Sequence, residues 1–511
     1  PPDMRTLLKT VFLALVLQAT ATADDESPAV VDVDLTAAPN VASAPASDRD
    51  VTNDERVATP LTLDEVLVSS GTHFPAILEA ELNRAVVAGE QQIAAGKFDL
   101  LFSAEGYKRA SGFYDGNVLI GKVEQPLRPL GAKLFGEYQI SEGDFPIYED
   151  GFFTNRGGRP KVGVILSLLR DRDIDDRRFA EQDALLALNE ADLDVLLTQL
   201  GVQRKAAMAY WKWVAYGQQL SVYLDLLEIA ENRDAGLIKQ VASGARARSF
   251  LTENQQNIIR RRTFVAAAER DYRQAANDLA FYLRDDTGSP MTPPDARLPA
   301  GVDPARRSEL IISDALASMD QIVGRQPDVQ KLRNTIRRAT NTIALRENAL
   351  RPQLDVSLSV SEGLGGVGEG GVSRDSTDTV VGVEFSVPLQ RREARGKLEQ
   401  ARRKLDALRV KEQQLQEQLA IELNDIVLTL RYAGQLAELS VEEVKQSSIL
   451  EQAELTRFRS GASDFFLVNI RERAVANARI KAIKAALDTR LAQVDFDTAT
   501  LNLTALGVQP R

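Results

Sequence analysis

Two long stretches without proline constrain this chain more than any other feature. Residues 161–289 and 389–509 contain no proline and are rich in Leu, Ala, Glu, Gln, Lys and Arg, which favour helices. Each stretch has one internal break, "ASGAR" around Gly244 and "RSGAS" around Gly461, where glycine suits the end of a helix. Each therefore predicts one helix of about 65–70 residues, spanning about 100 Å, followed by one of about 40 residues.

The second stretch also carries a regular apolar seam. Its members recur at spacings of three, four and seven residues, which is typical of a helix that packs in a coiled coil. They are Leu408, Leu415, Leu419, Ile426, Leu430, Ala433, Ala437 and Val444. Helices of this length do not fit a compact domain, so the pattern predicts an elongated helical assembly.

The chain contains a tandem repeat. The line "VGVILSLLRDRDIDDRR" from Val162 returns as "VGVEFSVPLQRREARGK" from Val381, at an offset of 219 residues. The two glycine breaks are offset by 217, whereas "FPAIL" at Phe74 matches "QPDVQ" at Gln326 with an offset of 252. The smaller later offsets indicate about 33 additional residues between the strands of the first copy. A duplication explains why the same strand-to-helix junction occurs twice.

The domain boundaries follow from this repeat and from the N-terminal composition. Arg5 and Lys9 flank a short apolar stretch that ends in "ATA" before Asp24, which predicts a signal peptide. An Ala/Pro/Asp/Ser-rich segment follows and predicts a disordered tether, and Thr62 and Glu65 then form a capping box that opens the first helix, expected to run to about Gly96. The expected organisation is a signal peptide at 1–23, a tether at 24–60, repeat 1 at 61–289, a Pro-rich linker at 290–308, repeat 2 at 309–507 and a tail at 508–511.

Short alternating segments predict strands. In "LDVSLSVS" from Leu354 and "VGVEFSV" from Val381, apolar and polar residues alternate, as in a strand of a membrane barrel, although a half-buried soluble sheet gives the same pattern. In repeat 1 we expect strands around 100–107 and 161–169. The segments "NVLIGKVEQ" and "AKLFGEYQIS" between them could add a hairpin or a plug-like excursion.

Composition excludes several functions. A net charge of −11 argues against nucleic acid as a partner, and the absence of cysteine excludes disulfides, thiolate metal sites and a cysteine nucleophile. The single histidine, His73, has no ligand partner nearby, and "GLGGVG" from Gly363 precedes a strand rather than the helix that a dinucleotide site requires. We therefore expect neither an enzyme nor a cofactor or metal site.

Three features occur twice in the chain, in the same order and at similar spacing: a proline turn, a strand-to-helix junction and a glycine break. Together they resemble the TolC-type outer-membrane efflux protein family. The resemblance implies a mainly α fold with a β-barrel part: long α-helical hairpins form a periplasmic α-barrel, and four transmembrane β-strands per chain enter a barrel shared by a homotrimer. It also implies an exit duct of a tripartite efflux or type I secretion system in the outer membrane of a Gram-negative bacterium. The implied partners are outer-membrane lipid, a periplasmic adaptor and an inner-membrane RND or ABC pump. The cargo is not specified.

Physical reasoning agrees that such a chain must oligomerise. Four strands cannot close a barrel, and open edges in lipid leave backbone groups unpaired at a cost of several kcal/mol each. The alternative is a periplasmic coiled-coil adaptor or scaffold without a barrel, but adaptors usually carry one helical hairpin between β-rich lobes, whereas this sequence predicts two hairpins.

The resemblance places the functional residues at the two glycine breaks, which become the periplasmic tip. The residues implied to contact the adaptor are Ser243, Gly244, Ala245, Ser460, Gly461 and Ala462. The possible gate residues are Phe458, Arg246, Arg248, Asp464, Leu467 and Ile470. Leu467 and Ile470 stand where well-studied members carry pore-narrowing aspartates. Asp464, Asn469 and Glu472 lie nearby in the sequence, so an acidic gate is an alternative. Arg246 and Arg248 either tether neighbouring coils or are simply solvated.

One further cluster has two interpretations. Asp171, Asp173, Asp175 and Asp176 stand at the expected start of a long helix. Carboxylates at a helix N-terminus interact favourably with its dipole, which explains the cluster without a functional role. The alternative is a cation-attracting lining of the pore.

Overall fold

The computed structural model describes residues 59–305 and 309–508. The predicted signal peptide, nearly all of the predicted tether and the end of the tail lie outside these residues. The described chain forms two compact units, each built from both repeats. The sheet unit comprises residues 90–185 and 338–404, and the helical unit comprises the remaining described residues.

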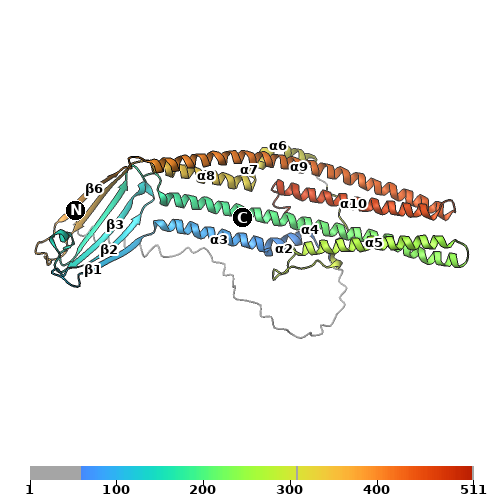
Figure 1. Cartoon of the computed structure of the whole chain (residues 1–511), viewed down its shortest axis with the longest axis horizontal. Coiled ribbons are helices and arrows are strands. Elements are labelled where there is room, and N and C mark those ends of the chain that lie inside the picture. Colours follow the sequence, from blue (N-terminus) through green and yellow to red (C-terminus); the bar gives the residue numbers. More distant parts are fainter. Residues whose placement is uncertain (1–58, 306–308, 509–511) are drawn as a thin grey trace, which may run out of the picture. The chain divides into compact units, whose positions relative to one another are not determined.

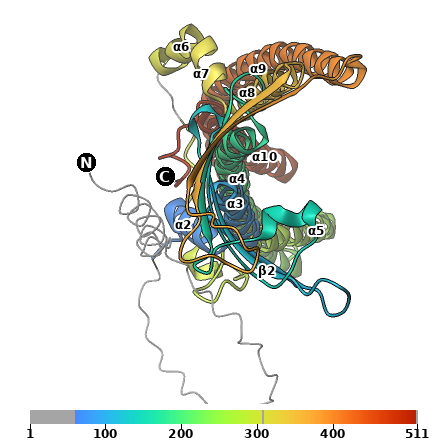
Figure 2. The same cartoon turned by 90° about the vertical axis from the view of Figure 1, so that its left-hand side faces the viewer.

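The sheet unit contains one antiparallel sheet of six strands that lie side by side in chain order (Figure 1). The strands are β1 Leu101–Lys108, β2 Asn117–Pro126, β3 Lys133–Glu142, β4 Arg159–Ser167, β5 Gln353–Glu362 and β6 Thr377–Ser386. The pairing of β4 with β5 joins the strands of repeat 1 to those of repeat 2. The sheet is curved rather than flat (Figure 2).

The expected number of four strands per chain is wrong, because the described chain has six. The sequence did not decide whether two further segments form a hairpin or a plug-like excursion. These segments are β2 and β3, and they form a hairpin that is inserted between β1 and β4. The chain turns between them at Leu130 and Gly131, both with positive φ. The hairpin accounts for the additional residues in repeat 1, and it is part of the sheet rather than a plug.

The register gives the sheet one apolar and one polar face. Residues that lie directly opposite each other on paired strands point to the same face. Leu354 lies opposite Phe385 and Val356 lies opposite Val383, which confirms the alternation expected for β5 and β6. Between these pairs on the other face, Asp355 lies opposite Glu384.

Both repeats begin with a helix that is broken before a proline. In repeat 1, α2 Leu63–His73 is followed by α3 Pro75–Ala95, so the single helix expected to run to Gly96 is in fact two. The residue before a proline disfavours the helical conformation, and Phe74 has extended backbone angles. The predicted capping box is present, since the backbone N–H of Glu65 donates to the Thr62 hydroxyl over 3.2 Å.

The long helices have the expected lengths. Helix α4 Asp176–Ala242 has 67 residues and α9 Arg392–Arg459 has 68. Their partners, α5 Arg248–Ala280 and α10 Phe465–Ala499, have 33 and 35 residues, fewer than the 40 expected. The remaining helices are α6 Glu309–Ala317, α7 Met319–Arg325 and α8 Pro327–Asn348, with short 3-10 turns at Gly96–Phe98, Pro129–Gly131, Ile147–Phe152 and Asp295–Arg297. None of the helices among the described residues has the length and apolar character needed to cross a membrane.

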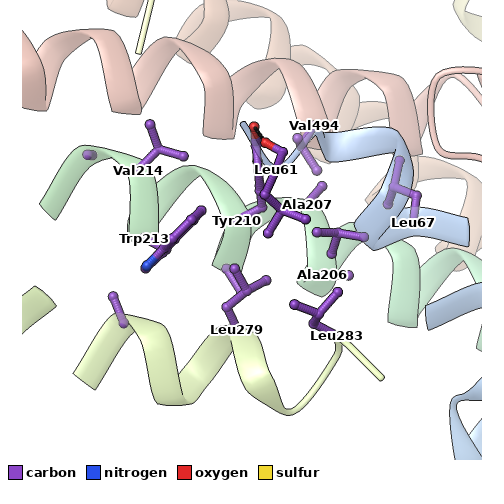
Figure 3. Close-up of a cluster of buried hydrophobic side chains, with 14 of the residues drawn as sticks. Leu61, Leu67, Ala206, Ala207, Tyr210, Trp213, Val214, Leu279, Leu283 and Val494 are labelled. Atoms are coloured by element: carbon purple, nitrogen blue, oxygen red, sulfur yellow. Dashed lines mark hydrogen bonds between the residues drawn. The ribbon is translucent and has the colours of Figure 1, made fainter. Parts of the chain in front are cut away.

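The main hydrophobic core lies in the helical unit (Figure 3). Trp213 of α4 is fully buried and stacks on Tyr272 of α5, with ring centroids 6.5 Å apart. Leu279 packs into the same cluster, which also takes in Leu61 before α2 and Val494 of α10. The core therefore joins segments from both ends of the described chain.

We expect Leu279→Ala to lower the free energy of unfolding by about 2–5 kcal/mol, because it removes a fully buried side chain and leaves a cavity. Denaturant unfolding followed by tryptophan fluorescence measures the change. Leu389→Ala is the matched control: Leu389 is 92% exposed, so its removal should change stability by less than about 0.5 kcal/mol. Equal effects would show that this cluster does not stabilise the fold.

Candidate functional site at the helix turns

The two predicted glycine breaks have the same backbone geometry. Gly244 and Gly461 have φ of 70° and 79°, in the left-handed region that glycine adopts without a steric penalty. In the first turn the N–H of Ala245 donates to Gln240 over 2.9 Å, and in the second the N–H of Ala462 donates to Arg457 over 2.9 Å. These are the hydrogen bonds of a Schellman motif, so each long helix ends on a glycine for the same physical reason.

The six residues predicted to contact an adaptor are all exposed. In Figure 1 both turns lie at the same end of the helical unit, where α4 meets α5 and α9 meets α10. The hydroxyls of Ser243 and Ser460 donate back to carbonyls of the preceding helix turn, to Gln240 and Arg457, over 3.0 and 2.9 Å. The turns therefore present two similar small, polar surfaces.

Arg246 connects the two turns. Its guanidinium lies 5.3 Å from the ring centroid of Phe250 and 5.3 Å from that of Phe458. Phe250 follows the first turn and Phe458 precedes the second, so the structure brings together two residues that the sequence placed in a gate. A cation held between two aromatic faces is stabilised by their quadrupoles.

The other predicted gate residues have separate positions. Asp464 is the N-cap of α10, where its carboxylate accepts the N–H of Leu467 over 2.8 Å. Arg248 is exposed at the first position of α5. The apolar side chains of Leu467 and Ile470 are about one-third exposed, at 38% and 37%.

A buried ion cluster lies next to the turns. Glu472 of α10 is buried, and its carboxylate binds two guanidinium groups, Arg233 of α4 and Arg261 of α5. Arg261 donates to it over 2.8 Å, and Arg233 also donates to Asn469 over 3.0 Å. Glu472 and Asn469 are therefore unavailable as exposed groups of an acidic gate. Instead they fasten α10 of repeat 2 to both helices of the first hairpin.

The cluster is electrostatically costly to bury. Burial lowers the pKa of the Arg261 guanidinium, and the hydrogen bond to Glu472 acts in the opposite direction. Burial, and next the negative charge of Glu472, raises the pKa of the nearby Glu451 carboxyl. Charges removed from water in this way are retained only where their partners remain in place.

Phe465 links the ion cluster to the arginine between the turns. This residue is almost completely buried, its ring lies 5.1 Å from the Arg233 guanidinium, and its centroid is 6.5 Å from that of Phe250. A continuous series of contacts therefore runs from Phe458 through Arg246, Phe250, Phe465 and Arg233 to Glu472. We call this series the tip network, and it holds the two helical hairpins of one chain together.

Sequence reasoning missed half of the tip network, together with Arg261, which also binds Glu472. Phe250, Phe465, Arg233 and Arg261 were not predicted as site residues. Arg261 had a usable signal, because it occupies the buried stripe of α5 together with Asn254, Ile258, Ala268 and Tyr272. A charged residue at an apolar position of a coiled-coil seam indicates a buried partner, although it does not identify that partner.

The aspartate cluster before α4 is engaged in local contacts. Asp175 accepts the N–H of Arg178 over 2.9 Å, as an N-cap does. Asp173 binds Arg351 over 2.8 Å, and this hydrogen bond lowers the pKa of the Asp173 carboxyl. Asp171 accepts from the amide of Asn348 over 2.7 Å. Three of the four aspartates of this cluster, Asp171, Asp173 and Asp175, therefore act as local capping or pairing groups.

We expect Glu472→Gln to destabilise the protein by about 3–5 kcal/mol, because it leaves buried arginine charge uncompensated. Thermal unfolding followed by the helical circular dichroism signal measures the effect. Glu231→Gln is the matched control, since the Glu231–Arg262 pair is exposed and should contribute no more than about 1 kcal/mol. Similar losses in both variants would mean that the buried pairs stabilise no more than a surface pair.

Comparison with known proteins agrees with this architecture. Residues 319–500 match the family model described as outer membrane efflux protein. No curated protein matches the chain by sequence.

Solved structures extend the likeness over most of the chain. A membrane protein from Pseudomonas aeruginosa is 15% identical, with a TM-score of 0.60, and the match covers 91% of this chain and 99% of that one. The Neisseria gonorrhoeae outer membrane channel MtrE in its open state is 16% identical, with a TM-score of 0.59 and coverages of 86% and 88%. The Campylobacter jejuni outer membrane channel CmeC is 13% identical, with a TM-score of 0.59 and coverages of 90% and 94%. The second repeat therefore matches the outer membrane efflux protein family, and the chain shares its fold with these solved membrane-protein structures.

Proposed function

We propose that this chain is the outer-membrane exit duct of a tripartite efflux or type I secretion system. It acts as a homotrimer, in which the sheets form a barrel in the outer membrane and the helices form a periplasmic tube. A periplasmic adaptor docks on the helix turns and connects the tube to an inner-membrane RND or ABC pump. The pump selects the cargo, and the duct itself performs no chemistry.

The observation that carries this proposal is the two-faced sheet. Its apolar face includes Phe102, Leu119, Val383 and Phe385, whose side chains are 56–68% exposed. A contiguous apolar surface of this kind needs to be covered, and alternation with polar residues is typical of a barrel with lipid outside and water inside. An adaptor without a barrel does not explain this face.

The helix turns support the adaptor part of the proposal. Both turns present an exposed Ser-Gly-Ala triplet on the same backbone motif, so one kind of partner surface can bind each of them in turn around a trimer. The tandem organisation, with repeat 1 at 61–289 and repeat 2 at 309–507, supplies one turn from each copy. We assign the gate to Arg246 and Phe458, which are in contact, together with the exposed apolar side chains of Leu467 and Ile470.

The function is tested on the detergent-extracted protein. Light scattering should give three times the mass of one chain, and planar bilayers should show discrete conductance steps. Far-UV circular dichroism should be dominated by helix, because the two long hairpins make up a large part of the chain. A monodisperse monomer without conductance would contradict the proposal.

We expect Gly461→Val to impair adaptor docking. Valine adopts the left-handed conformation of Gly461 only at a cost of about 1–2 kcal/mol, so the turn should distort while the trimer still assembles. Retention of a fluorescent pump substrate by cells measures the loss of efflux, and native gels measure the amount of trimer.

Gly236→Val is the matched control for added bulk. Gly236 lies within α4 and, like Gly461, has no atom within 4 Å of an added Cβ, but its φ is not positive. The control should therefore retain efflux. Normal efflux in Gly461→Val would show that docking does not depend on the geometry of this turn.

A further inference from the structure

The inserted hairpin of β2 and β3 is hydrogen-bonded to neighbouring strands on both sides, as strands within the wall of a barrel are. All ten residues of β2 pair with β3, and eight of them also pair with β1. On its other side β3 pairs with β4 from Lys133 to Gln139. A plug or an external excursion would leave β1 and β4 to pair with each other, whereas here two strands separate them.

The hairpin also continues the two faces of the sheet. Leu119 of β2 lies opposite Ile140 of β3, on the same face as Phe102 and Val162, and both are exposed. The opposite face of the hairpin is mixed, with Val118, Ile120 and Phe135 beside a group of charged residues. There Lys122 lies opposite Glu137, and Glu124 binds Lys122 and Lys133 over 2.5 and 3.5 Å. An extra hairpin lying on the outside of a barrel would not need this alternation in register with its neighbours.

Two strand edges remain open. Within residues 59–305 and 309–508, no strand pairs with the outer edge of β1 or of β6. All eight residues of β1 are exposed, as are nine of the ten residues of β6, whereas most residues of β2 to β5 are partly covered. In hydrocarbon an open edge costs several kcal/mol for each unpaired group, so both edges require a partner strand.

We propose that the hairpin widens the membrane barrel, so that three copies of this chain form a wall of eighteen strands in which β1 of one copy pairs with β6 of the next. This inference rests on the proposed trimeric duct. The occupant of each edge is a second copy, because β1 and β6 run antiparallel across the sheet and their free edges are complementary. Barrel diameter grows about linearly with strand number, so six strands per copy give a barrel about half as wide again as four.

The widened barrel has a distinct lumen. The hairpin adds Lys122, Lys133, Glu124 and Glu137 to the polar face, so each copy contributes paired charges of both signs to the inner wall. The duct therefore admits larger solutes at its membrane end than a barrel of four strands per copy, and its constriction lies at the helix turns instead.

Cysteine cross-linking tests the wall, because the native chain has no cysteine. Phe102→Cys combined with Val123→Cys should form a disulfide, since these residues are directly opposite on β1 and β2. Phe102→Cys combined in turn with Pro160→Cys, Val162→Cys or Val164→Cys should not, because β4 is three strand spacings, or about 14 Å, from β1. A disulfide from β1 to β4 would overturn the proposal.

The closure is tested between copies. Ala104→Cys on β1, combined with a cysteine at Thr377, Thr379 or Val381 on β6, should give covalent dimers and trimers on denaturing gels in at least one register. Electron cryo-microscopy of the unmodified trimer should resolve eighteen strands. A twelve-stranded barrel, or the absence of any β1–β6 bond, would overturn the inference. A mass other than three chains would instead overturn the trimeric duct, even if the β1–β2 disulfide forms.

Discussion

Unpaired backbone groups along the outer edges of β1 and β6 govern the organisation of this protein. A sheet with one exposed apolar face is suited to lipid, where an edge has no water to bond. Curvature of the sheet reduces the distance that closure must span but does not bring its own edges together. In the proposed duct, copies of the chain complete one another's sheet edges, and a shared barrel requires the attached helices to associate as well.

In the helical unit, two groups of contacts hold the very long helices in register. Apolar burial around Trp213 fixes the hairpins at one end, and the tip network fixes them near the turns. Glu472 is central because removing either of its two guanidinium partners would leave buried charge less well compensated, which destabilises the folded protein. Such a cluster favours one arrangement of α4, α5 and α10 over alternatives that leave charge unpaired.

The two repeats begin and end their helices in the same way, but the side chains at these positions differ. Both begin a helix at a proline, and both end a long helix at a left-handed glycine. After the turn, however, α10 starts on the capping carboxylate of Asp464, whereas α5 follows Ala247 and has no side-chain cap. The two halves therefore share a proline at a helix start and a left-handed glycine at a helix end, whereas their capping side chains differ.

The sequence by itself determined the elements that depend on local rules. Proline-free stretches, glycine breaks and the capping box located the long helices and their ends, since each acts through the backbone of neighbouring residues. Alternation identified four strands, but it left β2 and β3 open because strand pairing is a contact between distant residues that periodicity does not specify. Only the tertiary structure decided that the hairpin enters the sheet, that Arg246 meets Phe458 and that Glu472 faces two arginines. These contacts join residues as much as 239 positions apart, and the local sequence around a residue does not specify a contact partner at that distance.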